Sequence, residues 1–321
     1  MNHTPLPPLV AVVGPTASGK SALAMALAER LGGEVINTDS MQVYRGFDIG
    51  TGKLSQAERR RVTHHLIDVA NPAEQYSAGR YIADARAAIA GMVERGRVPI
   101  LCGGTGLYFR ALLFGMAEIP QVSARVRDAV EAWLKQKGLA AGHAELTRVD
   151  PVTAAKVHPN DPARIARALE VYRMAGVPLS AYRRAQPFAE SAPGALSVGT
   201  SFERPELYRR IGQRVRAMIA RGWIEEVEGL LGQGYGPGLK PMRAIGYRQI
   251  AAWLGGGRLP EGGGEALAEA IATHTRRYAK RQMTWFRGMG GAVWLDIDSQ
   301  DQPSTFDTLA QALFPDGAEA A

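Results

Sequence analysis

The stretch Gly14-Pro-Thr-Ala-Ser-Gly-Lys-Ser21 decides the fold of this chain. It follows the apolar run Leu9-Val-Ala-Val-Val13 and precedes a helical pattern, which is the strand–GxxxxGK(S/T)–helix context of a phosphate-binding loop. The two glycines allow successive backbone N–H groups to point inward, and the following helix adds its positive N-terminal end. Lys20 is expected to place an ammonium on the terminal phosphates, and the Ser21 hydroxyl to reach a magnesium ion. The sequence therefore predicts a site for an oligophosphate.

Strands and helices alternate on both sides of this loop. The expected strands are Val10–Val13, Glu34–Asn37, Val98–Cys102, Leu196–Thr200 and Val293–Ile297, and the expected helices are Lys20–Leu31, Ser77–Arg95, Pro205–Ala220, Ile224–Leu231, Tyr247–Leu254 and Ala266–Phe286. Such alternation predicts an α/β fold, a P-loop-containing parallel sheet flanked by helices. Ligands bind at the carboxyl ends of the strands of such sheets.

The pattern changes after Pro120, where the sequence becomes helical throughout. Helices are expected at Ser123–Lys137, Ala140–Arg148 and Asp161–Ala175, and a loop with Pro187 and Pro193 leads back to the sheet. We therefore expect a P-loop catalytic core formed by residues 1–120 and 195–321. Residues 121–194 are expected to form an all-helical insertion domain.

The composition is that of a globular protein. The chain has 321 residues, of which 46% are hydrophobic and 21% are charged. Its one cysteine, Cys102, excludes an intrachain disulfide and a thiolate zinc cluster, and we expect it to pack as a small hydrophobe. No secretory signal and no apolar run of membrane-spanning length occur, so we expect a cytoplasmic protein that does not enter a membrane. A monomer is the expected state.

The basic residues are unevenly distributed. The net charge is +7, and no acidic residue occurs between Glu269 and Asp296, where five Arg or Lys residues alternate with Tyr278, Trp285 and Phe286. Such a segment suits phosphate neutralisation and base stacking in nucleic-acid binding. It is equally typical of an amphipathic helix that packs its aromatic side chains on a core. Both interpretations remain open at this point.

The sequence does not favour a nucleotide triphosphatase. Such enzymes add a second apolar strand that ends in a magnesium-binding acid. The candidate strand Val98–Cys102 instead runs into Gly103-Gly-Thr-Gly106, which carries no carboxylate. A group-transfer enzyme is therefore favoured over a motor or a switch.

Two polar residues follow the ends of neighbouring strands. Asp39 follows Glu34–Asn37, where a carboxylate can accept a proton from an incoming nucleophile. The alternative is an Asp that caps a turn. Thr105 is expected either to point its hydroxyl over the phosphates, to cap the next helix, or both. His64 and His65 have no cysteine partners, so we expect core or loop histidines rather than metal ligands.

Several stretches together resemble the bacterial tRNA dimethylallyltransferases, also called tRNA isopentenyltransferases. They are Gly14–Ser21, Asp-Ser-Met-Gln-Val-Tyr-Arg-Gly at 39–46 with Gly-Thr-Gly-Lys at 50–53, Gly-Gly-Thr-Gly-Leu-Tyr at 103–108, His-Pro-Asn-Asp with Arg-Ile-Ala-Arg-Ala-Leu-Glu between 158 and 170, Arg-Ala-Ile-Gly-Tyr-Arg at 243–248, and Arg-Tyr-Ala-Lys-Arg-Gln-Met-Thr-Trp-Phe-Arg at 277–287. These motifs cover nearly the whole chain in the order of that family. The combination is specific, whereas the phosphate loop alone is also an ATP-binding motif.

The resemblance implies a reaction. A dimethylallyl group passes from dimethylallyl diphosphate to N6 of the adenosine at tRNA position 37, next to the anticodon, which gives N6-isopentenyladenosine. It implies Asp39 as the base, with Thr105 and Lys20 as further catalytic residues. It also implies Mg²⁺ at Ser21 and a diphosphate held by Gly14, Pro15, Thr16, Ala17, Ser18, Gly19, Lys20 and Ser21.

The same resemblance implies a large contact surface for tRNA, with the helical insertion on the anticodon stem-loop. The implied contact residues are Asp39, Ser40, Met41, Gln42, Thr105, Arg127, Ala163, Arg164, Ile165, Ala166, Arg167, Arg243, Ala244, Ile245, Gly246, Tyr247, Arg248, Arg276, Arg277, Tyr278, Ala279, Lys280, Arg281, Gln282 and Met283. The target adenine has to leave its stack to reach the donor carbon.

Three alternatives stay open at the sequence level. A P-loop small-molecule kinase would share the loop and the early Asp, but has no need of the basic aromatic segment. An RNA-binding protein with a vestigial phosphate loop would bind RNA without turnover. An adenylate isopentenyltransferase would prenylate AMP, and the helical insertion argues against it.

Overall fold

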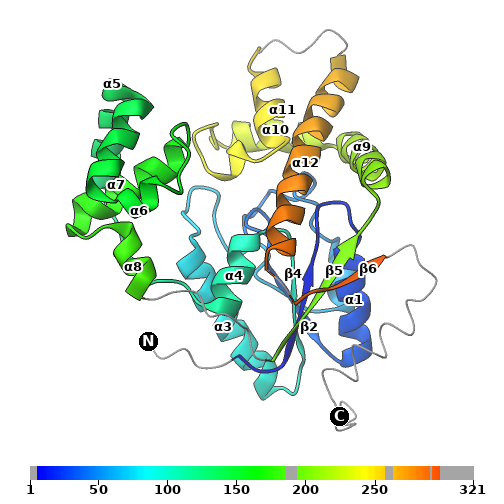
Figure 1. Ribbon diagram of the computed structural model, residues 1–321. Coiled ribbons are helices and arrows are strands. Elements are labelled where there is room, and N and C mark those ends of the chain that lie inside the picture. The colour runs from blue at the N-terminus through cyan, green and yellow to red at the C-terminus, as the bar shows by residue number, and fades with distance from the viewer. Residues whose placement is uncertain (1–5, 186–193, 257–262, 290, 297–321) are drawn as a thin grey trace. The chain divides into compact units, whose positions relative to one another are not determined.

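The computed structural model describes residues 6–185, 194–256, 263–289 and 291–296 of the chain (Figure 1). The chain divides into two compact units, the first formed by Met1–Leu113 with Ala192–Ala321 and the second by Phe114–Ser191. The first unit contains the sheet and the phosphate loop, and the second contains only helices within its described part.

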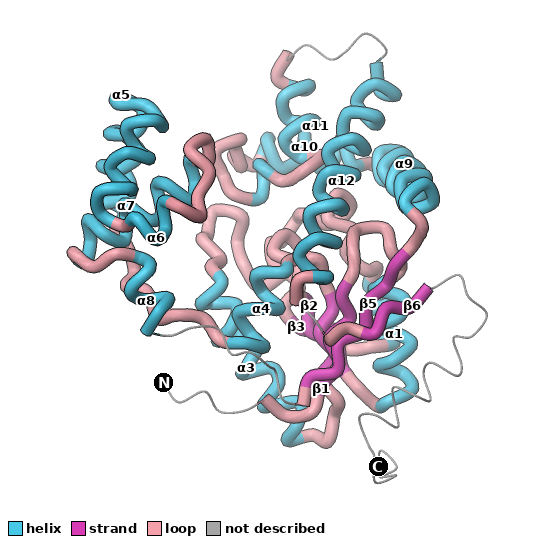
Figure 2. The backbone as a smooth tube through the Cα atoms, in the orientation of Figure 1, coloured by secondary structure: helices cyan, strands magenta, loops and turns pink. Residues whose placement is uncertain are grey.

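The first unit is a parallel α/β sheet with helices around it (Figure 2). Its strands are β1 (Leu9–Val13), β2 (Glu34–Asn37), β3 (His64–His65), β4 (Pro99–Cys102), β5 (Ala195–Ser201) and β6 (Val293–Asp296). Its helices are α1 (Lys20–Leu31), α2 (Gln56–Arg61), α3 (Ala78–Glu94), α4 (Gly106–Phe114, which ends at the unit boundary), α9 (Arg204–Ala220), α10 (Trp223–Gly232), α11 (Tyr247–Leu254) and α12 (Gly263–Arg287), with a short 3-10 turn at Pro241–Arg243.

All neighbouring strands are parallel, in the order β3-β2-β4-β1-β5-β6. β1 lies between β4 on one side and β5 on the other. The chain therefore leaves β1 towards one half of the sheet and later returns to its opposite side. A ligand site is expected at this reversal point, beyond the carboxyl end of β1, and the phosphate loop begins there.

Burial explains why β1 is a continuous apolar run. Its five residues are at most 2% exposed, as expected for a parallel strand that is covered on both faces. Val10 and Val12 pack against Ala24, Leu27 and other apolar residues of α1. On the other face, α3 packs against β2 and β4. The core of this unit thus fixes the strand that carries the loop.

The helix α4 is held by aromatic contacts. The rings of Tyr81 on α3 and Tyr108 on α4 stack with centroids 4.0 Å apart and an angle of 9° between their planes. Phe109 meets Phe286 of α12 edge to face at 5.7 Å. Because α4 begins directly after the Gly103–Thr105 loop, these contacts also fix that loop.

The second unit contains α5 (Ala124–Val149), α6 (Pro151–Ala154), α7 (Pro162–Ala175) and α8 (Leu179–Ala185). Val130 and Leu146 of α5 pack with Ile165 and Leu169 of α7 in its core. Asp150 is 1% exposed and accepts hydrogen bonds from the backbone N–H of Thr153 on α6 and of Ser180 on α8. One buried carboxylate thus joins two short helices.

The predicted fold class is confirmed. The ends of most predicted elements agree with the structure within about two residues, which is the usual difference between ways of assigning helix ends. The two helices expected at Ser123–Lys137 and Ala140–Arg148 are confirmed, because α5 is interrupted at Gly138, whose backbone is not helical (φ 81°, ψ 166°). The short elements β3, α2, α6 and α8 were not predicted, because segments of two to seven residues show too little periodicity. Ile297, expected to end the last strand, lies outside the described residues.

The stacked tyrosines give a test of this packing. The hydroxyls of Tyr81 and Tyr108 are buried and have no hydrogen-bond partner among the described residues. Tyr81→Phe should therefore raise the free energy of unfolding by about 1 kcal/mol, because it removes an unsatisfied buried hydroxyl. Tyr76→Phe is the matched control, since the Tyr76 hydroxyl donates to Asp84 at 2.6 Å, and it should lower stability by about 1 kcal/mol. Urea unfolding measures both, and a loss of stability in Tyr81→Phe would contradict the packing described.

Candidate functional site

The phosphate loop is held from behind by β5. The Ser18 and Thr200 hydroxyls are hydrogen-bonded at 2.5 Å, and both residues are fully buried. Gly14 has a φ of 154°, and a Cβ there would overlap the Thr200 hydroxyl. The first glycine of the motif is thus required by a close approach to β5.

A second support comes from α12. The side-chain oxygen of Gln282 accepts a hydrogen bond from the Thr16 N–H at 2.9 Å, and its NH₂ group donates to the Gly104 carbonyl at 2.9 Å. Gln282 is 5% exposed. This one side chain therefore joins the phosphate loop to the loop after β4.

Lys20 lies over the loop at the start of α1. Its ammonium donates to the Pro15 carbonyl at 3.3 Å, and burial lowers its pKa from the ordinary value while the nearby Asp39 carboxylate opposes that shift. An ammonium binds a negatively charged phosphate oxygen more strongly than it binds a neutral carbonyl oxygen. The residue is placed to bind a phosphate group.

Asp39 begins a turn at the carboxyl end of β2. Its own N–H donates to the Asn37 side chain at 2.9 Å, and its Oδ1 accepts from the Met41 N–H at 2.8 Å. Its Oδ2 makes no hydrogen bond within the described residues. The turn-capping interpretation is therefore confirmed for Oδ1, and the role of Asp39 as a proton acceptor stays a prediction that the position of Oδ2 permits.

Thr105 is placed differently from the expectation. Its hydroxyl accepts a hydrogen bond from the Ser40 N–H at 3.0 Å, next to Asp39 in sequence. It does not contribute to the walls of the three cavities described below. This placement supports a role in holding the Asp39 turn rather than direct contact with phosphate.

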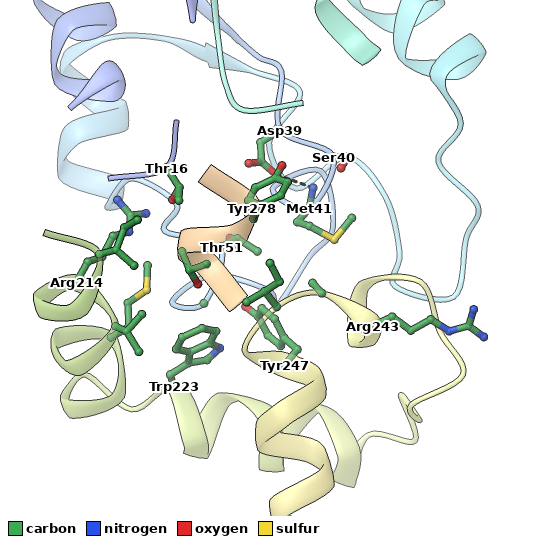
Figure 3. Close-up of a pocket in the computed structure, with 17 residues that line it drawn as sticks. Thr16, Asp39, Ser40, Met41, Thr51, Arg214, Trp223, Arg243, Tyr247 and Tyr278 are labelled. Carbon is green, nitrogen blue, oxygen red and sulfur yellow. Dashed lines mark hydrogen bonds between the residues drawn. The ribbon is translucent and has the colours of Figure 1, made fainter. Parts of the chain in front are cut away.

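Three cavities follow one another past these residues. The first, of about 320 Å³, is lined by Thr16, Asp39, Met41 and Tyr278 together with apolar side chains of α9, α10 and the 243–247 segment (Figure 3). The second, of about 80 Å³, is lined by Lys20, Ser21, Asp39 and Gln282 among others. The third, of about 470 Å³, lies along residues 17–22 of the loop and α1. Neighbouring cavities share lining residues, so the three lie next to one another around Asp39, Arg214 and the phosphate loop, and together they are called the passage below.

Arg214 of α9 is the residue that the sequence analysis missed. It lines all three cavities and makes no hydrogen bond or ion pair among the described residues. Arg214 is exposed, and desolvation by the surrounding protein lowers the pKa of its guanidinium, whereas the nearby Asp39 carboxylate raises it. Ile211, Val215 and Met218 share its face of the helix and are buried. A cation on the apolar face of an amphipathic helix was the available signal.

The site also has the atoms that a magnesium ion prefers. Ser21 and Asp39 line the same cavity, and hydroxyl and carboxylate oxygens suit this hard cation. The described residues contain no cluster of three or more His, Cys, Asp or Glu side chains that could hold a metal by themselves. The residues fit an ion that is bound mainly by substrate phosphates and water, which is usual for magnesium.

The predicted tRNA contacts fall into several environments. In the first unit, Ser40, Met41, Arg243, Ala244, Ile245, Tyr247 and Tyr278 line the first cavity and Gln42 lines the second, whereas Arg248, Arg277, Lys280 and Arg281 are exposed. Gly246 is buried, Met283 is partly buried, and Arg276 is bound by Glu269 and Thr273.

Two predicted contacts in the first unit have other roles. Ala279 is fully buried, and Gln282 holds the phosphate loop, so their placement does not support direct contact with RNA. Phe286 is also buried, whereas Trp285 is 36% exposed. The interpretation of the segment as an amphipathic helix is thus confirmed, since α12 packs one face on the core and exposes basic residues on the other, whereas nucleic-acid binding stays a prediction.

In the second unit, Ile165 is fully buried in the core. Arg164 and Arg167 are exposed near Asp161 and Glu170, with the charged groups 3.5 and 3.7 Å apart. Ala163 is exposed, Ala166 and Arg127 are partly buried, and Arg127 has an interaction partner. Contact of these residues with tRNA therefore stays a prediction, which the exposure of Arg164 and Arg167 permits.

The other predicted structural residues are accounted for by packing. Both histidines lie on the edge strand β3. His64 Nδ1 is hydrogen-bonded to the Val62 carbonyl at 2.7 Å, and His65 Nε2 is hydrogen-bonded to the Glu34 carboxylate at 2.6 Å. Burial raises the pKa of the Cys102 thiol to about 11, so this cysteine is not a reactive thiolate.

Comparison with known proteins identifies the family. The family described as IPP transferase matches residues 42–289, and the family described as isopentenyl transferase matches residues 7–75. The tRNA dimethylallyltransferase of Geobacter metallireducens is 49% identical over 305 residues, covering 95% of this chain and 96% of that protein. The chain belongs to the tRNA dimethylallyltransferase family. It is an enzyme of this type.

Solved structures of the family agree in fold. A full-length tRNA isopentenylpyrophosphate transferase from Bacillus halodurans is 37% identical, with a TM-score of 0.68 and coverage of 96% of this chain and 97% of that one. A eukaryotic dimethylallyltransferase acting on tRNA is 28% identical, with a TM-score of 0.77 and coverage of 95% and 78%. Among the described residues, every helix is too short or too polar to cross a bilayer.

The position of Arg214 gives a test of the passage. Arg214→Gln should raise the KM for a diphosphate substrate by about 10- to 100-fold, because a charge-assisted hydrogen bond to phosphate is lost. Arg216→Gln is the matched control on the same helix, since Arg216 is exposed and pairs with Glu265. Equal kinetic constants in the Arg214 variant and the control would contradict the assignment of this side chain to the phosphate site.

Proposed function

We propose that the protein transfers the dimethylallyl group of dimethylallyl diphosphate to N6 of the adenosine at tRNA position 37. The observation that carries this proposal is the position of Asp39 between a phosphate loop and a largely apolar cavity. The polar cavity suits the diphosphate, and the larger cavity falls in the size range of small-molecule sites, about 300–1,000 Å³. The names of the relatives support the same activity.

The residues of the site account for each part of the proposed transfer: bond formation, departure of the diphosphate and removal of the proton. The N6 nitrogen of the adenine forms a bond to C1 of the dimethylallyl group as the C1–O bond breaks, and the diphosphate leaves with the electron pair. Amides of the Gly14–Ser21 loop, Lys20 and Arg214 stabilise the charge that develops on the diphosphate. The Asp39 carboxylate takes the proton from N6, whose lone pair is otherwise delocalised into the ring.

Magnesium is part of the proposal. Ser21 is the residue that would hold it, with the diphosphate supplying further oxygens. When bound, the ion would stabilise negative charge on the leaving diphosphate. The loop therefore serves a prenyl donor in this proposal, although its sequence is that of an ATP-binding motif.

The acceptor is proposed to be the anticodon stem-loop of tRNA. The exposed basic face of α12, with Arg277, Lys280 and Arg281, and the exposed arginines of α7 supply cations for its phosphates. The target base would be turned out of the stack into the first cavity. We further propose that the enzyme acts as a monomer in the cytoplasm.

A small-molecule kinase is the second candidate function, and the residues favour it less. The strand β4 ends at Cys102 and is followed by glycines, so no acid follows it to hold a nucleotide-bound magnesium. Hydrolysis of ATP in the absence of any prenyl donor would favour this candidate.

The base is tested by Asp39→Asn. Asparagine keeps an oxygen that can accept from the Met41 N–H, so the turn is retained while the proton acceptor is lost. Transfer of labelled dimethylallyl to an unmodified anticodon stem-loop should fall about 10²- to 10⁴-fold, with RNA affinity unchanged. Glu94→Gln, an exposed change at the end of α3, controls for loss of charge. Undiminished transfer in Asp39→Asn would remove Asp39 as the base.

A further inference from the structure

One carboxylate outside the site described so far collects three successive backbone amides. Glu226 on α10 accepts from the N–H groups of Asp48 at 3.0 Å and Ile49 at 2.6 Å through Oε2, and from Gly50 at 3.3 Å through Oε1. Successive amides that point to one centre form an anion-binding concavity. In this molecule the anion is a side chain of the protein itself.

The same carboxylate holds a second segment. The Tyr247 hydroxyl donates to Oε1 of Glu226 at 2.6 Å, and Tyr247 is fully buried at the start of α11. Burial and the neighbouring carboxylate raise the pKa of Tyr247 well above its ordinary value, so the phenol remains a donor. Glu226 therefore binds the 48–50 loop and α11 at the same point.

Trp223, one turn earlier on α10, contacts both segments through its ring. A Cβ at Gly50 or at Gly246 would overlap the indole, so the backbone of each segment lies directly against it. Trp223 is 2% exposed. The first turn of α10 thus joins the two segments twice, once by apolar packing and once by hydrogen bonds.

The loop is also fixed on its other side. The side chain of Lys53 is 2% exposed. Its ammonium donates to the Asp48 carboxylate at 2.7 Å, the Asp68 carboxylate at 2.5 Å and the Tyr44 carbonyl at 2.6 Å. With Lys53 on one side and Glu226 on the other, the 48–53 loop is fixed between two charged groups.

The residues that contact Glu226 or Trp223 directly border the first cavity. Gly50, Trp223 and Tyr247 line the first cavity and neither of the other two, whereas Thr51 lines the first and second cavities and Gly52 lines the second. Glu226 itself lines none of the three. Its nearest route to a ligand is therefore through the wall of the first cavity.

We propose that Glu226 is a positioning residue that shapes the acceptor half of the passage, independently of the donor half. The proposal rests on the proposed function, since it assigns the first cavity to the acceptor base. Loss of the hydrogen bonds that Glu226 accepts should raise the KM for the RNA substrate and leave the KM for the prenyl diphosphate unchanged.

Glu226→Gln tests this directly. Both carboxylate oxygens of Glu226 accept hydrogen bonds from N–H or O–H donors. Glutamine has only one acceptor oxygen, so its NH₂ group would lie against donors and could not bind them. The KM for the anticodon stem-loop should rise about tenfold, while the KM for dimethylallyl diphosphate stays within about twofold. Glu228→Gln is the matched control, an exposed change on the same helix that should leave both values unchanged. A rise in both KM values, or in neither, would overturn the proposal.

Two further measurements keep the test independent of folding and of the reaction. Hydrogen exchange at the amides of Asp48, Ile49 and Gly50 should be faster in Glu226→Gln and unchanged in Glu228→Gln, without any substrate present. Tyr247→Phe keeps the three amide bonds, so exchange there should match the wild type while the KM for RNA rises a few-fold. Unchanged exchange in Glu226→Gln, or an unchanged KM for RNA in Tyr247→Phe, would contradict the proposal that Glu226 connects the 48–50 loop to α11. Absence of transfer by the wild type would instead contradict the proposed function.

Discussion

Two side chains from the far half of the sequence fix the shape of the phosphate loop. Thr200 of β5 binds Ser18 behind the loop, and Gln282 of α12 binds the Thr16 N–H beside it. These contacts hold the backbone of the loop in place without a ligand. Such preorganisation matters for catalysis, because donors that are already oriented need no rearrangement when charge develops.

The rest of the site is arranged around that loop. β1 lies at the centre of the sheet, so the ends of β2 and β4 bring the Asp39 turn and the Gly103–Thr105 loop to the same edge. Gln282 joins the loop after β4 to the phosphate loop, and Thr105 joins it to the Asp39 turn. A short chain of hydrogen bonds thus connects the phosphate loop to the Asp39 turn. The 48–50 loop and α11 are joined separately, through Glu226.

Much of this could be predicted from the sequence, and the remainder has physical reasons. The phosphate motif and the strand–helix alternation predicted the sheet, and Asp39 was found because the carboxyl ends of parallel strands meet at one edge. Gln282 and Glu226 act through contacts over more than 170 residues, which no local pattern indicates. Thr105 was expected over the phosphates, at the cap of the next helix, or both, because its hydrogen bond to Ser40 spans 65 residues and leaves no local pattern. Arg214 left a signal, a cation on an apolar helix face, that was not used.

The central claim is that the phosphate loop holds the leaving group of a prenyl donor. The most direct measurement supplies labelled dimethylallyl diphosphate, an unmodified anticodon stem-loop and ATP together, with magnesium, and follows all products. We predict one diphosphate released for each dimethylallyl group found on N6 of the adenosine next to the anticodon, with the ATP intact. Consumption of ATP, or release of diphosphate without transfer to the RNA, would contradict this account.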